Sequence, residues 1–264
     1  MDKMHLTPEK GEFEGRRPMP QLPMLRRRAL LLAVCAPTAA RSGQAPLHVL
    51  VDGSIEMPQA LFKDGQAVDG LQVELAREIG RRLDRPVAFH LVPRRRVAPM
   101  LAAGEQADLI CNYLPAWLPG PLQWSRAYLD DADLLVTAAR RTRPSQLSDV
   151  AGQPIGTVSG FVYPEVAAAL GPRFLRDDAP NAIATLRKLA LGRVDHALVG
   201  RVTFEYLMRR GDVPVDLHPP FVIARFKTAC ALSPRSPVTL TQLDGALAAM
   251  QSDGSLGRIF DRYR

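Results

Sequence analysis

Strand-like and helix-like segments alternate along this chain from Leu47 onward, and their order limits the folds that the chain can adopt. The run LHVLV at 47–51 is largely apolar, as expected of a strand buried on both faces. In 71–83 an apolar residue recurs every four positions, which predicts an amphipathic helix. The pattern continues with a strand at 87–92, a short helix at 97–104 and a strand at 107–111. This order predicts an α/β fold with a mostly parallel sheet flanked by helices.

A second series of the same kind follows the basic, proline-containing segment 139–152. Asn181 is expected to cap a helix at its N-terminus, and Gly192 to end that helix. The predicted strands are 154–159, 194–199 and 226–232, and the predicted helices are 163–170, 181–192 and two closing helices within 239–263.

The charge of the chain argues against a nucleic-acid partner. The net charge is +7, and residues 1–45 hold eight basic and four acidic residues, which accounts for +4 of it. The remaining residues mix Arg with Asp and Glu, whereas a nucleic-acid groove needs clustered cations interleaved with aromatics. Hydrophobic residues make up 47% of the chain and charged residues 23%, as in an ordinary globular protein of one large domain or two lobes.

The N-terminus has the composition of an export signal. Arg26, Arg27 and Arg28 precede an apolar run at 29–36 and small residues up to Ala45, which predicts a signal peptide at about 24–45 after an upstream extension at 1–23. The apolar run is too short to span a membrane. Val34 spoils the likeness of 32–35 to a lipoprotein box, so we expect no lipid anchor. A buried N-terminal helix is the alternative, and the start codon and cleavage site stay open.

Export would leave Cys111 and Cys230 in an oxidising compartment, where they could pair. Each also lies in an apolar, strand-like run, so two buried thiols are the alternative. No Cys or His pair has the spacing of metal ligands, and we expect neither a metal nor a cofactor.

Six segments in order resemble one family over nearly all of residues 46–264. They are DGLQVELAREIGRRL, VAPMLAAGEQADLI, WSRAY, LSDVAGQPIGTVSG, LALGRVDHALV and MQSDGSLGRIFDRY. Together they resemble the family 3 extracellular solute-binding proteins, the polar amino acid type of periplasmic substrate-binding protein.

The resemblance implies a two-lobed, Venus-flytrap fold of the type II periplasmic binding class. Lobe 1 would comprise 46–136 plus 228–264 and lobe 2 would comprise 137–227, with two crossing hinge strands between two mostly parallel sheets. A small molecule would be held between the lobes, since hinge closure surrounds a solute. The implied protein is a periplasmic monomer that serves an ABC transporter permease.

Ligands of such folds lie beyond the carboxyl ends of the strands. The residues that the resemblance places there are Asp52, Ile55, Arg94, Asn112, Tyr113, Trp117, Ser159, Gly160, Phe161, Val162, Tyr163, Gly200 and Arg201. The turn at 159–163 precedes a predicted helix, and its backbone N–H groups form a candidate anion site.

Two departures from the family pattern bear on the ligand. The family's Arg that grips an α-carboxylate is missing from 112–124, and Gly200 stands where the family has an Asp for the α-ammonium. We therefore expect a small polar or anionic ligand other than a standard α-amino acid, with Arg94 and the 159–163 turn as its grip. Alternatively, Arg94 belongs to a solvated charge run with Arg95 and Arg96, and Trp117 serves packing alone.

Binding without catalysis is the expected function. The alternatives are an enzyme on the same scaffold, similar to cyclohexadienyl dehydratase, and a sensor for a membrane partner. An enzyme needs an acid or base in the cleft, for which Asp52 and Glu56 are the candidates near the first strand. His90, His196 and His218 have no Ser or Cys partner in a nucleophile motif.

Overall fold

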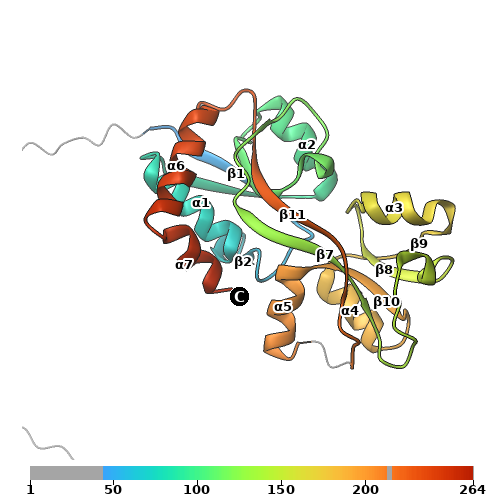
Figure 1. Cartoon of the computed structure of the whole chain (residues 1–264). Coiled ribbons are helices and arrows are strands. Elements are labelled where there is room, and N and C mark those ends of the chain that lie inside the picture. The colour runs from blue at the N-terminus through green and yellow to red at the C-terminus, as the bar shows by residue number, and fades with distance from the viewer. Residues whose placement is uncertain (1–43, 213–215, 264) are drawn as a thin grey trace, which may run out of the picture. The chain divides into compact units, whose positions relative to one another are not determined.

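Two groups of strands share one continuous sheet in this protein. The computed structural model describes residues 44–212 and 216–263, and within them a nine-stranded sheet has the order β4-β1-β5-β11-β7-β10-β8-β9, with β6 paired to β11. One end of the sheet forms the first lobe and the other end forms the second lobe (Figure 1).

The first lobe is built on strands β1, β4 and β5, with α1, α6 and α7 packed together beside them. Its elements are β1 (Leu47–Asp52), a hairpin of β2 (Leu61–Lys63) and β3 (Gln66–Asp69), α1 (Leu71–Arg82), β4 (Val87–Val92), α2 (Arg94–Ala103), β5 (Leu109–Tyr113), the 3-10 turn η1 (Pro115–Trp117), β6 (Gln123–Trp124), α6 (Leu240–Ser252) and α7 (Ser255–Asp261).

The second lobe is built on parallel strands β8, β9 and β10. Its elements are η2 (Leu147–Val150), β8 (Pro154–Val158), α3 (Pro164–Leu170), η3 (Gly171–Arg173), β9 (Leu175–Ala179), α4 (Ala182–Ala190), β10 (His196–Gly200) and α5 (Arg201–Arg210).

Two long antiparallel strands, β7 (Leu129–Thr137) and β11 (Phe221–Leu232), run from one lobe to the other. They pair with each other along most of their length, from Phe221 opposite Leu135 to Thr228 opposite Leu129. Beyond that stretch β11 pairs with β5, while β7 pairs with β10 through Asp133–Thr137. The two strands therefore form the connection between the lobes.

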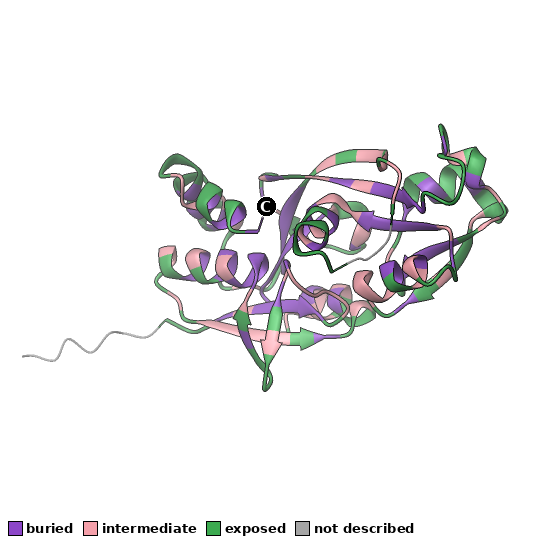
Figure 2. Cartoon of the chain, turned by 90° about the horizontal axis from the view of Figure 1, so that it is seen from below, coloured by how far each residue is buried: buried purple, intermediate pink, exposed green. Residues whose placement is uncertain are grey.

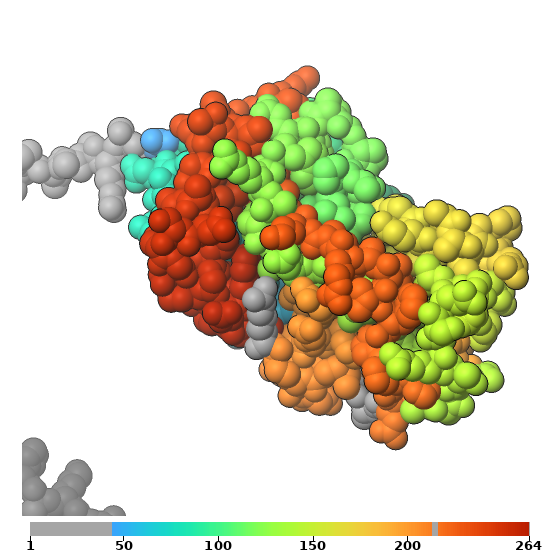
Figure 3. Space-filling view, in the orientation of Figure 1, coloured from blue at the N-terminus to red at the C-terminus, as the bar shows by residue number. Residues whose placement is uncertain are grey.

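Each lobe has hydrophobic clusters of its own. In the first lobe the helix pattern at 71–83 buries Leu71, Leu75 and Ile79 against β1, β5 and the C-terminal helices. In the second lobe Leu186 and Leu189 of α4 pack under β7 and β10. Figure 2 shows the buried strands enclosed by helices whose outer faces are exposed. Figure 3 shows the C-terminal helices (red) and the region of α3 (yellow) on opposite sides of the molecule.

The predicted α/β fold is confirmed, and so are the predicted ends of two helices. The Asn181 side chain accepts a hydrogen bond from the Ala184 N–H at 2.8 Å, and Gly104 ends α2 in the left-handed region at φ 69°. The strand predicted at 107–111 lies two residues later, because β5 spans Leu109–Tyr113, and the strand predicted at 226–232 is longer than expected, because β11 begins at Phe221. Strand β7 and helix α5 were not predicted. The predicted extension and the signal peptide up to residue 43 lie outside the described residues.

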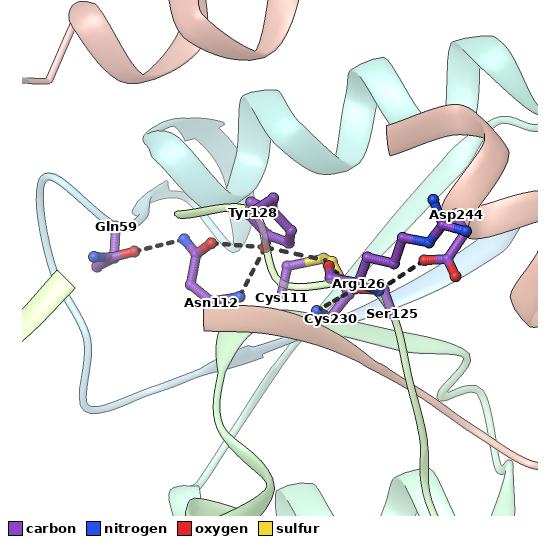
Figure 4. Close-up of a disulfide and its surroundings, with 8 residues drawn as sticks. All are labelled: Gln59, Cys111, Asn112, Ser125, Arg126, Tyr128, Cys230 and Asp244. Atoms are coloured by element: carbon purple, nitrogen blue, oxygen red, sulfur yellow. Dashed lines mark hydrogen bonds between the residues drawn. A yellow bond between two sulfur atoms is a disulfide. The ribbon is translucent and has the colours of Figure 1, made fainter. Parts of the chain in front are cut away.

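Cys111 and Cys230 form a disulfide that joins β5 to β11. Beside it the Tyr128 hydroxyl lies 3.4 Å from Cys230 Sγ and donates to Asn112 Oδ1 at 2.8 Å (Figure 4). Ser125 exchanges hydrogen bonds with the Cys230 backbone, and so holds β11 on the side opposite β5. The disulfide therefore fixes the first-lobe end of a connecting strand.

Replacing both cysteines, Cys111→Ser with Cys230→Ser, is expected to lower the free energy of unfolding by about 2–5 kcal/mol, because the bond closes a loop with a sequence separation of 119. Urea denaturation of the two proteins measures the difference. A reductant should lower the wild-type midpoint and leave that of the double variant unchanged. Equal midpoints of the oxidised wild type and the variant would contradict the structural role.

Candidate functional site

A cavity of about 120 Å³ lies where the two lobes and both connecting strands meet. A single buried water needs roughly 10–15 Å³ by the same kind of measure, so the cavity accommodates a small solute. Its lining comprises Ser54, Ile55, Glu56, Gln59, Gln72, Arg94, Asn112, Tyr113, Trp117, Asp131, Asp133, Val158, Phe161, Val162, Tyr163, Ala182, Leu198, Val199, Gly200, Thr203 and Phe226.

Asn112, one residue before the end of β5, lies in the left-handed region with φ 64°. Its backbone N–H donates to the Tyr128 hydroxyl at 3.1 Å, and its side-chain amide donates to Gln59 Oε1 at 3.0 Å (Figure 4). Asparagine tolerates this backbone region better than most residues. The amide is thus held between β5, the loop after β1 and the disulfide region.

Arg94 is the first residue of α2 and lines the cavity. Its guanidinium lies 3.6 Å from the carboxylate of Asp52, which is 0% exposed, and donates to the Trp117 carbonyl at 3.1 Å. The guanidinium carbon also lies 4.7 Å from the ring centre of Tyr113 and 5.3 Å from that of Phe161. The positive charge of Arg94 is therefore already matched by Asp52 and two aromatic faces.

Aromatic side chains form much of the remaining wall. Trp117 meets Tyr113 edge to face at 6.2 Å and Phe226 of β11 at 5.2 Å between ring centres. Burial raises the pKa of the Tyr113 hydroxyl, which donates to Asp52 at 3.1 Å. These rings supply flat apolar surface from the first lobe and from a connecting strand.

Asp131 and Asp133 line the cavity from β7. Residues two apart on a strand share a face, so both carboxyl groups point the same way. Burial raises the pKa of Asp133 from 3.8 to about 7, and the charges of Asp131 and Glu165 add to the effect. The Asp133 side chain makes no hydrogen bond or ion pair with any other residue that the structure describes, although its backbone pairs within the sheet.

Burial likewise raises the pKa of Asp131 from 3.8 to about 6, with a smaller contribution from Glu205. Hydrogen bonds from the Ala132 and Val202 N–H groups, at 2.8 and 3.2 Å, and the charge of Arg201 oppose this rise. Both bonds end on Oδ1. The second carboxylate oxygen, Oδ2, lies on the side of Gly200, at 3.7 Å from the point where a Cβ would stand.

Glu56 reaches from the loop after β1 to the second lobe. Its carboxylate accepts a hydrogen bond from the Ile183 N–H at 2.7 Å, in the first turn of α4. Burial raises the pKa of Glu56, while this bond and the nearby charge of Arg187 lower it. The contact joins the two lobes directly across the cavity, at the positive end of a helix dipole.

Nine of the thirteen predicted site residues line the cavity: Ile55, Arg94, Asn112, Tyr113, Trp117, Phe161, Val162, Tyr163 and Gly200. The other four do not. Asp52 lies beneath the cavity, bonded to Ser54, Tyr113 and Arg94. Arg201 donates to the Asp130 carbonyl on the far side of β7. Ser159 and Gly160 are exposed beside the cavity.

The 159–163 turn, the predicted anion site, is partly hydrogen-bonded within the protein. The Ser159 N–H donates to the Ala179 carbonyl at 2.9 Å, and the Phe161 N–H donates to the Val158 carbonyl at 3.1 Å. Arg176 fills the same turn and donates to the carbonyls of Val158 and Phe161. The N–H groups of Ser159 and Phe161 are therefore already used by the protein itself.

Sequence reasoning missed the acidic residues of β7 as well as Gln59, Gln72 and Phe226. Gln72 is 4% exposed, and its Oε1 has no hydrogen-bond donor among the described residues. A polar residue on the otherwise apolar face of a predicted helix was an available signal. Asp131 and Asp133 gave no such signal, because β7 was not predicted as a strand.

Within the described residues, no three His, Cys, Asp or Glu side chains are grouped as metal ligands. The same part of the chain contains no helix whose length and apolarity suit a membrane crossing.

Neither a protein-family model nor a curated protein matches the sequence. Solved structures do match it. AbpA of Streptococcus pneumoniae, an amino acid ABC transporter substrate-binding protein bound to L-arginine, is 16% identical with a TM-score of 0.65, over 83% of this chain and 94% of that one. The fold is the two-lobed type II periplasmic binding fold.

Two further solved structures share this fold. A histidine kinase sensor domain with similarity to periplasmic binding proteins is 19% identical, with a TM-score of 0.68, over 84% of this chain and 96% of that one. An ancestral amino acid-binding protein, a precursor of cyclohexadienyl dehydratase, is 15% identical with a TM-score of 0.68, over 83% and 95% of the two chains. At these identities the likeness shows the fold alone.

The raised pKa of Asp133 predicts how stability depends on pH. An acid whose pKa rises on folding lowers stability as it ionises, so this penalty is absent below pH 4 and grows progressively up to about pH 7. Asp133→Asn should be more stable than wild type by about 1–3 kcal/mol at pH 8, with the gap closing toward pH 4. Urea denaturation of protein refolded from denaturant measures this, and Asp130→Asn on the exposed face of β7 is the control. A gap that does not change with pH would contradict the assignment.

Proposed function

We propose that this protein is an exported solute-binding protein that captures a small polar molecule between its lobes. The observation that carries the proposal is the cavity lined by both lobes and by both connecting strands. A site built across a hinge binds and releases its ligand by lobe closure and opening. The type II periplasmic binding fold supports the same conclusion.

The proposed partner is an ABC transporter permease, and the proposed location is the periplasm. The disulfide supports export, because such bonds persist in oxidising compartments. A sensor that signals to a membrane partner has the same structural requirements, and a sensor domain is among the similar structures. We expect the protein to act as a monomer.

The lobes are proposed to comprise 46–136 plus 228–264 and 137–227, with one adjustment. Asp133–Thr137 pair with β10 of the second lobe, which favours a boundary before Asp133. Both acidic residues of the cavity then lie at the hinge between the lobes.

An enzyme on this scaffold is the second candidate. A partly buried acid with a pKa near neutrality is suited to donate or accept a proton, and Asp133 meets that description. It replaces Asp52 as a candidate acid, because Asp52 is held beneath the cavity by Arg94 and Tyr113. The similarity to a precursor of cyclohexadienyl dehydratase supports the same alternative.

A ligand of the cavity should raise the melting temperature of the protein and itself remain chemically unchanged. Thermal-shift screening of refolded protein against amino acids, amines, dicarboxylates and aromatic acids measures the rise in melting temperature. A ligand at a concentration one hundred times its Kd stabilises the folded protein by about 2.7 kcal/mol. Chromatography of each stabilising compound after incubation shows whether the compound is chemically unchanged. Turnover of prephenate or arogenate would show that the protein is an enzyme rather than a binding protein. If no compound raised the melting temperature, both the binding function and the enzyme alternative would be contradicted.

Glu56→Ala should open the ligand-free protein, because it removes the bond between Glu56 and the Ile183 N–H that joins the lobes. We expect a larger radius of gyration in small-angle X-ray scattering. Glu56→Gln is the matched control, since its amide oxygen can still accept the bond and should keep the wild-type radius. An unchanged radius in Glu56→Ala would show that the contact does not hold the lobes together.

A further inference from the structure

The charges around the cavity point to the sign of the ligand. The lining holds three carboxylates, Glu56, Asp131 and Asp133, and one basic side chain, Arg94. These four charged side chains differ in how far other groups of the protein neutralise them. The groups that are left uncompensated indicate what a ligand must supply.

Arg94 offers little to an anion. Asp52 lies 3.6 Å from its guanidinium, and the Trp117 carbonyl accepts one of its N–H groups. An anionic ligand at Arg94 would have to compete with a fully buried carboxylate that cannot move into water. Like charges in a site of low polarity repel each other strongly. The first-lobe side of the cavity therefore disfavours a ligand carboxylate.

Two of the three carboxylates of the lining are also compensated. Glu56 accepts the Ile183 N–H and lies near Arg187. Asp131 accepts two backbone N–H groups on Oδ1 and is attracted by Arg201 from outside the cavity. Its second oxygen faces the space left by Gly200.

Asp133 is the uncompensated group. It sits opposite Gly200 in the register of β7 and β10, it points into the cavity, and it has no partner among the described residues. Asp133 is partly buried, and a partly buried carboxylate without a partner carries a desolvation cost that a ligand cation or a proton would offset. A positive group would neutralise the charge of Asp133 and could also contact Oδ2 of Asp131, which accepts no hydrogen bond from the described residues.

Gln72 and the aromatic rings are independent observations with the same implication. The buried Oε1 of Gln72 lacks a donor among the described residues, so a ligand N–H would satisfy it. Trp117 and Phe226 both line the cavity, where they meet edge to face, and aromatic rings attract organic cations that approach their faces.

We propose that the ligand is an organic cation with at least one amine or guanidinium group and no carboxylate, and that Asp131 and Asp133 receive its positive charge. The inference rests on the proposed binding function and specifies its ligand class. It replaces the expected anionic ligand, since Arg94 is paired with Asp52.

Matched compounds test the two parts of the proposal. Agmatine and L-arginine carry the same guanidinium, as cadaverine and L-lysine carry the same amine, and phenethylamine matches L-phenylalanine. Within each pair only the second compound has a carboxylate. Isothermal titration calorimetry of refolded protein at pH 8 should show at least one of the three amines binding about tenfold or more tightly than its amino acid.

The roles of Asp131 and Asp133 are tested with the amine that binds most tightly in these titrations. Asp131→Asn and Asp133→Asn should each weaken binding of the amine by about tenfold or more, because a charge-assisted hydrogen bond is lost. The Asp131→Asn variant retains a side-chain oxygen for the Ala132 and Val202 N–H groups, which protects the fold. Asp130→Asn changes the same charge on the exposed face of the same strand and should leave affinity unchanged. Circular dichroism and melting curves establish that each variant is folded.

The results separate this inference from the proposed function. If an amino acid, a dicarboxylate or an aromatic acid bound more tightly than the amines, the proposed cationic ligand would be wrong, while the proposed solute-binding function would stand. If Ca²⁺ or Mg²⁺ bound and no amine did, the proposal that the ligand is an organic cation would be wrong. Amine binding that is unaffected by both aspartate variants would overturn the assigned residues. If no compound of any class binds, the proposed function itself fails.

Discussion

The pairing of β7 with β11 is the constraint on which the rest of the structure depends. Both lobes attach their sheets to this ladder, β5 along one end of β11 and β10 along one end of β7. Side chains alternate across a strand, so the ladder also decides which residues of β7 face the cavity. Asp131 and Asp133 line the cavity, whereas Asp130 is exposed to solvent. The hinge and the acidic wall of the site are thus one element.

Much of the fold was predictable because its strands are short, apolar and separated by amphipathic helices. The same rule located Asn112 and Tyr113, since the carboxyl end of β5 opens into the cavity. Strand β7 escaped prediction because Leu129–Thr137 carries three aspartates in its first half, an unusual composition for a strand. Its acids could be assigned to the site only from the register that sets Asp133 opposite Gly200.

Gly200 illustrates how a position can mislead when it is considered alone. From the sequence, its lack of a side chain suggested that an acidic group of the site had been lost. In the structure, a carboxylate oxygen of Asp131 lies 3.7 Å from where a Cβ of residue 200 would be. An acid is present in that region, supplied by the neighbouring strand. Arg94 shows the converse, because a basic residue expected to hold a ligand is paired inside the protein with Asp52.

The energetics of Asp133 connect the site to the hinge. A carboxyl group whose pKa rises to about 7 on burial costs stability once it is ionised, and hydrophobic residues would fill a strand position at no such cost. Retention of the acid is understandable if a ligand cation offsets the desolvation when the lobes close around it. Because the same strand carries the acid and joins the lobes, neutralising that charge would favour the closed arrangement. Ligand charge and lobe closure would then be linked through one side chain, without a separate relay between the site and the hinge.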